Sequence, residues 1–266
     1  MRGPRYVVRG AWGALIGVGT LALLPARHLV AQKLEDNSFI IEEAYNQPAR
    51  VVQHIGTGAV AEGTAALSFT QEWPLGGRRH QLSYTLVGVD DDALDLGDAL
   101  INYRFQAFGA GGETFLAAPR ASVLIPLGDA DRRAGNGGYG LQLALPLSWE
   151  ALPRLSLHGN LGGTWRPNAE DLTGDEAATL DGYAGASAIF FITDKVNLLA
   201  ESVWRHGRRI RGPGRSEGVP SQTVSLGARV GFDVGGVQFV PGAAWLPAID
   251  DVPEGAFFYL SVEHGF

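Results

Sequence analysis

The stretch 256-AFFYLSVEHGF-266 closes the chain, and its apolar residues recur at every second position. One parity carries Phe258, Leu260, Val262, His264 and Phe266, and the residues between them are more polar. Successive residues of a β-strand point to opposite faces, so this alternation is a strand pattern. The pattern predicts a terminal strand with one apolar face, and an aromatic residue stands at its last position.

Such an ending is typical of bacterial outer-membrane β-barrels. In that class of protein, Phe258, Leu260, Val262 and Phe266 would form the signal that the barrel assembly machinery reads. We therefore expect the barrel assembly machinery, periplasmic chaperones and outer-membrane lipid as partners. The location that this implies is a Gram-negative outer membrane.

The same alternation recurs along the chain in strand-length segments that clusters of Gly, Pro, Asp and Asn separate. Barrels made of a single chain have an even number of antiparallel strands. We predict an all-β fold over residues 50–266, a transmembrane antiparallel up-and-down β-barrel of about 12 strands. The segments are 51–60, 64–74, 79–88, 97–108, 113–127, 139–149, 155–165, 179–193, 195–205, 223–234, 236–246 and 256–266.

Connector lengths and tryptophan positions favour the same topology. With a periplasmic N-terminus, the even-numbered connectors are short turns and most odd-numbered connectors are longer outer loops, as barrels require. Trp73 and Trp149 fall at inner strand ends, whereas Trp165, Trp204 and Trp245 fall at outer ends, all on the apolar parity. Because indole rings prefer the membrane interface, these positions predict its two boundaries.

The N-terminal residues predict export. Residues 1–31 combine a basic start, an uncharged apolar run and a cleavage point after Leu29-Val30-Ala31, which are the parts of a signal peptide. The chain has no cysteine, which excludes a lipoprotein anchor and a disulfide framework. Residues 32–49 do not alternate, and 33–47 could enter the lumen. We predict that 32–49 is a periplasmic segment and a potential plug.

The amino-acid sequence around this segment resembles that of a known family. Asn37-Ser38-Phe39, Glu42-Glu43-Ala44-Tyr45-Asn46-Gln47 and Val51-Val52-Gln53-His54 are similar to the outer-membrane transporters grouped with the MetA pathway of phenol degradation. The resemblance is specific over residues 37–54 and architectural afterwards. It implies an outer-membrane barrel with a transport role, without identifying phenol as the solute.

If the apolar parity faces lipid, the opposite parity lines the lumen. Inward charges of both signs have two interpretations, a pore lining that selects solutes or a network of ion pairs that seals a structural barrel. A barrel of twelve strands lies between the filled and the open sizes, so both alternatives stand. The candidate solute path comprises Glu72, Arg104, Arg120, His158, Asn160, Asp181, Glu201, Arg229, Asp233 and Glu263.

Enzymatic function is the weaker alternative. Ser156, His158 and Asn160 stand on one face at alternate positions, and a hydrolase needs residues of these types. Outer-membrane phospholipase A also places Ser and His on one strand, but here the order is reversed and both residues face away from lipid. We therefore predict no enzyme, no cofactor and no metal, since phosphate-loop and zinc spacings are also absent from the sequence.

The charge balance excludes nucleic acid as a partner. Removal of residues 1–31 takes four of the 21 Lys and Arg and none of the 28 Asp and Glu, which leaves a net charge of −11. Arginines in the ninth connector, 206–221, could pair with lipopolysaccharide phosphates on the outer surface. The function that fits best is a channel or transporter for a small solute, with hydrophobic or aromatic compounds among the candidates.

Overall fold

The computed structural model describes residues 34, 37–90, 93–132 and 134–266, so the predicted signal peptide lies outside the described residues. The described chain forms one antiparallel sheet of 14 strands. No helix in this part of the chain is long and apolar enough to cross a membrane. The strands are β1 (Val51–Ala61), β2 (Thr64–Pro74), β3 (His80–Asp90), β4 (Leu94–Phe105), β5 (Phe115–Ala117), β6 (Arg120–Ile125), β7 (Gly140–Leu152), β8 (Leu155–Glu170), β9 (Glu176–Phe191), β10 (Val196–Gly212), β11 (Arg215–Val230), β12 (Phe232–Val234), β13 (Val237–Leu246) and β14 (Gly255–Gly265).

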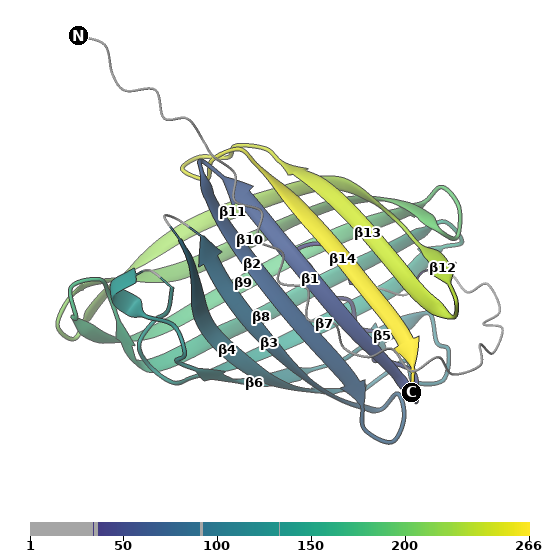
Figure 1. Ribbon diagram of the computed structural model, residues 1–266, viewed down its shortest axis with the longest axis horizontal. Coiled ribbons are helices and arrows are strands. Elements are labelled where there is room, and N and C mark those ends of the chain that lie inside the picture. Colours follow the sequence, from purple (N-terminus) through teal and green to yellow (C-terminus); the bar gives the residue numbers. More distant parts are fainter. Residues whose placement is uncertain (1–33, 35–36, 91–92, 133) are drawn as a thin grey trace, which may run out of the picture.

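The sheet closes into a barrel of twelve wall strands (Figure 1). Two of these strands are interrupted, β5–β6 at Pro119, which has no N–H to donate to a neighbour, and β11–β12 at Gly231. Each wall strand pairs with its neighbours in the sequence, and β1 pairs with β14 from Val51–Gly265 to Ala61–Gly255. The backbone N–H of Phe266 donates to the carbonyl of Arg50 at 3.0 Å. The predicted fold class and strand number are confirmed.

The barrel is apolar outside and polar inside, the reverse of a water-soluble barrel. Phe258 is 54% exposed and Trp204 is 63% exposed on the outer face, whereas Arg104 and Arg229 are each 2% exposed within. An exposed apolar surface of this extent is stable in lipid and unstable in water. The chain therefore folds as a bacterial outer-membrane β-barrel, and the predicted parity of its strands is confirmed.

The wall is taller on one side than the sequence predicted. The expected long loops at 166–178 and 206–221 are mostly strand, because β8 runs to Glu170, β9 starts at Glu176, and β10 and β11 meet at a turn after Gly212. Trp165 and Trp204 consequently lie short of their strand ends, which corrects that part of the prediction. In Figure 1 these teal and green strands reach further than the purple and yellow ones.

Cross-strand pairs explain the extension. The guanidinium of Arg211 lies 2.8 Å from the carboxylate of Glu217, and the guanidinium of Arg208 donates to the hydroxyl and the carbonyl of Ser216 at 3.0 Å. Gly214 adopts a φ of 67°, a left-handed conformation that glycine accepts without steric cost. These contacts hold the polar residues 206–217 in a hairpin rather than in a loop.

Candidate functional site

Residues 37–50, here called the lumen segment, lie inside the barrel. Near the segment's start, the N–H of Leu34 donates to the carbonyl of Asp194 in the turn between β9 and β10, and its end joins β1. Both ends of the segment are therefore on the periplasmic side. Between them Phe39, Ile41 and Ala44 are buried, and the segment contacts strands on opposite sides of the barrel.

Side chains of the wall pair with the irregular backbone of the lumen segment. The Glu201 carboxylate accepts from the N–H of Ile40 at 3.3 Å and from the N–H of Ile41 at 3.2 Å. Asn160 accepts from the N–H of Glu42 at 2.8 Å and donates to its carbonyl at 2.7 Å. Buried backbone groups need such partners. These inward polar residues therefore replace the hydrogen bonds that a helix or a sheet would supply.

Residues of other strands complete this pairing. The hydroxyl of Ser148 accepts from the N–H of Ala44 at 2.8 Å, and Gln81 accepts from the N–H of Gln47 at 2.7 Å. Gln106 donates to the carbonyl of Ala44 at 2.8 Å. Strands β3, β7, β8 and β10, together with Gln106 directly after β4, thus all hold the segment, which occupies the periplasmic half of the lumen.

Glu42 lies between two arginines of the wall. Its carboxylate oxygens are 3.0 Å from Nη1 of Arg104 and 2.9 Å from Nε of Arg120. Burial opposes ionisation of Glu42, but the positive charges of Arg120 and Arg104 outweigh it and hold the pKa of this carboxyl below its ordinary value. The segment is therefore bound to β4 and β6 through a charged, multiply hydrogen-bonded carboxylate.

Glu43 makes the second charged contact, on the opposite side of the lumen. Its carboxylate lies 3.4 Å from Nη1 of Arg229 and accepts from the Ser38 hydroxyl at 3.1 Å. Nε2 of His158 lies 3.9 Å away. Arg229 is fixed from the wall by a 3.0 Å hydrogen bond from its Nε to Asn197. Two adjacent acids of the segment thus bind arginines on different strands.

An apolar contact anchors the start of the lumen segment. The ring of Phe39 lies 5.8 Å from the ring of Phe257 and 5.9 Å from that of Tyr259. A Cβ atom on Gly242 would approach the Phe39 ring to 2.6 Å, so only glycine leaves room for the ring there. Phe257 and Tyr259 belong to the inward parity of the terminal strand, whose other face meets lipid.

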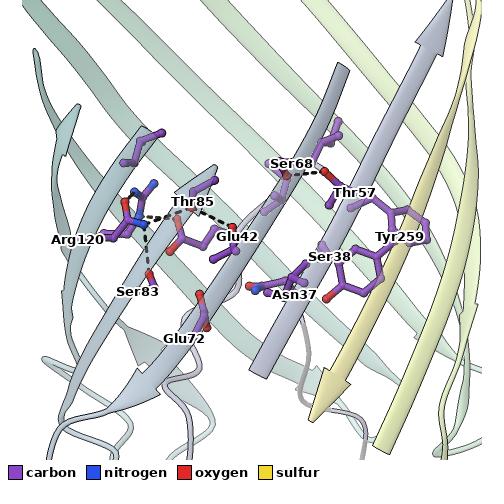
Figure 2. A pocket seen from close by; sticks show the side chains of 17 residues that line it. Asn37, Ser38, Glu42, Thr57, Ser68, Glu72, Ser83, Thr85, Arg120 and Tyr259 are labelled. Atoms are coloured by element: carbon purple, nitrogen blue, oxygen red, sulfur yellow. Dashed lines mark hydrogen bonds and ion pairs between the residues drawn. The ribbon is translucent and has the colours of Figure 1, made fainter. Parts of the chain in front are cut away.

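A cavity of about 280 Å³ remains beside the segment (Figure 2). It is lined by the lumen segment on one side and by strands β1 to β4, with Arg120 of β6 and Tyr259 of β14, on the other. The wall contributes hydroxyl pairs, Thr57 with Ser68 at 2.7 Å and Thr70 with Thr85 at 2.9 Å. Ile55, Leu100 and Tyr259 add apolar surface. The cavity is therefore amphipathic.

The structure gathers seven of the ten predicted path residues around the lumen segment. These are Glu72, Arg104, Arg120, His158, Asn160, Glu201 and Arg229. The other three lie elsewhere. Asp181 is 3.6 Å from Arg166 in the outer half, Asp233 is exposed and 2.8 Å from Lys195, and Glu263 opposes Gln53 towards the periplasmic end.

Sequence reasoning missed Ser148 and the two acids of the segment. The hydroxyl of Ser148 lies 2.7 Å from Nδ1 of His158, and the two residues are cross-strand partners, whereas the serine weighed in the hydrolase alternative was Ser156. Ser148, His158 and Glu43 resemble a hydrolytic triad by residue type. However, all three are buried, and the N–H of Ala44 already occupies the Ser148 hydroxyl. The described residues contain no group of three metal-ligating side chains.

Comparisons with known proteins agree on the fold. No protein-family model and no curated protein matches the sequence. Among solved structures, an outer membrane channel from Pseudomonas putida F1 is similar with a TM-score of 0.62 and 12% identity, covering 84% of this chain and 98% of that one. The NanC porin is similar with a TM-score of 0.54 and 10% identity, covering 81% and 100%. At these identities the likeness is one of architecture.

Proposed function

We propose that this chain is an outer-membrane channel for a small solute and that residues 32–49 act as its plug. The observation that carries the proposal is the lumen segment, which fills the periplasmic half of the barrel and leaves a cavity of about 280 Å³ beside it. The fold shared with an outer membrane channel and a porin agrees with this function. The resemblance of residues 37–54 to the transporters grouped with the MetA pathway supports it further.

The lumen segment contacts the strands of the wall unevenly, which suggests a route for the solute. Its charged contacts go to β4, β6 and β11, and several of its backbone contacts go to β7, β8 and β10. On β1 to β3, Gln81 accepts from the segment, but the hydroxyls of Thr57, Ser68, Thr70 and Thr85 pair with one another. A solute would pass on this side, between hydroxyls and the apolar surface of Ile55. A compact molecule with an apolar body, such as an aromatic compound, suits this lining.

The alternative is a structural barrel with a sealed lumen. A specific observation favours it, because the polar groups of the segment find so many partners in the wall. The two functions differ in one respect. A plug must be able to move or leave, whereas a sealing segment is permanent.

A reversible disulfide tests the difference. The hydroxyl oxygens of Ser38 in the segment and Ser187 on β9 are 3.2 Å apart, and the chain has no native cysteine. The double variant Ser38→Cys/Ser187→Cys should therefore form a bond between segment and wall under oxidising conditions. The pure protein is then studied in planar bilayers, with the two single variants as controls.

Oxidation should lower the conductance of the double variant, a reductant should restore it, and both single variants should be insensitive. Deletion of residues 34–47 should give a constitutively conducting barrel. If neither the reduced variant nor the deleted protein conducts, the sealed-barrel function replaces our proposal. Conductance that is equal in the oxidised and reduced states would show that the segment is no gate.

A further inference from the structure

We infer that Arg104 and Arg120 form a binding site for the carboxylate of an anionic solute, that Arg229 on the opposite side of the lumen adds to the positive charge, and that Glu42 and Glu43 of the lumen segment pair with these arginines at rest. This inference rests on the proposed plug function and names the solute class. The opposite charges at this site come from different parts of the chain. The three arginines belong to the wall, whereas the two carboxylates that they bind belong to the segment.

Undocking of the segment would leave positive charge in excess at the constriction. With the segment in place, Arg104 and Arg120 pair with Glu42, Arg229 pairs with Glu43, and the wall acid Glu72 lies 3.7 Å from Arg104. Without the segment, these three guanidinium groups keep the carboxylate of Glu72 as a partner. A buried cation that has lost its partner is costly, since the desolvation penalty is no longer offset. The vacated lumen therefore favours the entry of an anion.

Arg120 would keep its position after the segment leaves. Its Nη1 donates to Asn102 at 2.9 Å and its Nη2 donates to Gln142 at 2.9 Å, and a further hydrogen bond reaches Ser122. All three partners are wall residues. Only Nε is used for Glu42, at 2.9 Å. The donor is thus preorganised for a carboxylate and requires no rearrangement to accept one.

The cavity determines which kind of molecule can carry the solute carboxylate. Arg120 and Glu42 both line it, as Figure 2 shows, so a solute carboxylate in place of Glu42 would direct its body into this space. The wall there offers Leu100, Ile55 and Tyr259 beside the hydroxyl pairs. A small organic carboxylate with an apolar body matches both parts. Such a solute would displace the plug by competing with Glu42 for the same donors.

The test measures ion selectivity and solute response in planar bilayers with the full chain. The variant Glu42→Gln/Glu43→Gln keeps the side-chain volumes and removes both charges. In a KCl gradient its conductance should rise, and its reversal potential should shift towards the chloride equilibrium potential. For the wild type, benzoate should increase channel opening, whereas neutral benzyl alcohol of similar size should not.

Arg120→Gln should abolish the benzoate response, and Lys195→Gln, which removes an exposed cation at the periplasmic rim, should retain it. If Arg120→Gln does not fold, Arg120→Lys keeps the charge but lacks the planar donor fork, and it should weaken the response. Cation preference in the double variant, or equal responses to the two compounds, would overturn the carboxylate site. Failure of the 34–47 deletion to conduct would instead refute the proposed channel.

Discussion

Replacement of Arg104 by Met should release the lumen segment from the wall. Arg104 donates to the side chains of Asn46 at 2.7 Å and Glu42 at 3.0 Å, to the carbonyl of Glu43 at 3.3 Å, and to the carbonyl of Tyr45. All of these acceptors lie in the segment. The methionine side chain fills most of the volume but donates nothing, so the variant isolates the loss of these bonds from the loss of packing.

The expected magnitude follows from burial. Arg104 is 2% exposed, and removal of one partner from a buried ion pair costs about 3–5 kcal/mol. Since about 1.4 kcal/mol is a factor of ten, the docking equilibrium should shift by roughly a hundredfold to a few thousandfold. Arg120 continues to hold Glu42, so the lower end of this range is the more realistic expectation.

Proteolysis reports this equilibrium directly. A glutamate-specific protease can cut after Glu42 or Glu43 only when the segment has left the lumen, and the rate of cutting then follows the open population. Arg211→Met is the matched control, because Arg211 pairs with Glu217 at 2.8 Å but both are exposed on the outer hairpin. If the Arg104 and Arg211 variants are cut at the same rate, Arg104 does not hold the segment and the reasoning fails.

Three other outcomes are expected. The pKa of Glu42 is lowered from 4.5, so its ion pairs stabilise the docked segment above pH 4.5 and are lost as the pH falls through the lowered pKa. Conductance should therefore rise on acidification below pH 4.5. The variant Glu42→Gln should show no such rise. Gly242→Ala should push against Phe39 and weaken docking by about 1–3 kcal/mol in the protease assay, whereas Gly56→Ala, whose Cβ would meet nothing nearer than 4.0 Å, should have no effect. Phe266→Ser should lower the amount of barrel assembled in the outer membrane without preventing refolding in detergent; equal amounts of assembled variant and wild type would refute a role in the assembly signal.

The wall could be predicted from the sequence because a membrane barrel imposes one simple rule on every strand. Lipid contact requires an apolar side chain at alternate positions, so the parity of Phe258 and Leu260 is visible without any knowledge of their neighbours. The same rule placed Arg104, Arg120 and Arg229 inside. It could not place Asp233, which keeps the inward parity but lies at the exposed end of its strand beside Lys195.

The partners of the lumen segment could not be predicted. The segment has no regular secondary structure, so its sequence has no period from which orientation can be read. Its contacts also join distant positions, such as Ile41 with Glu201, which are 160 residues apart. The pairing of Ser148 with His158 depends on strand register, which alternation alone does not fix.

The uneven height of the wall has a consequence for approach from the cell exterior. Strand β10 has 17 residues and β13 has 10, and both start at the periplasmic side. At about 3.3 Å per residue and a tilt of about 40°, the seven additional residues raise one side of the rim by about 18 Å. The outer opening of the barrel is therefore oblique and faces sideways, over the lower edge formed by β13, β14, β1 and β2. In the proposed channel, a solute that approaches along the membrane surface would enter over that edge.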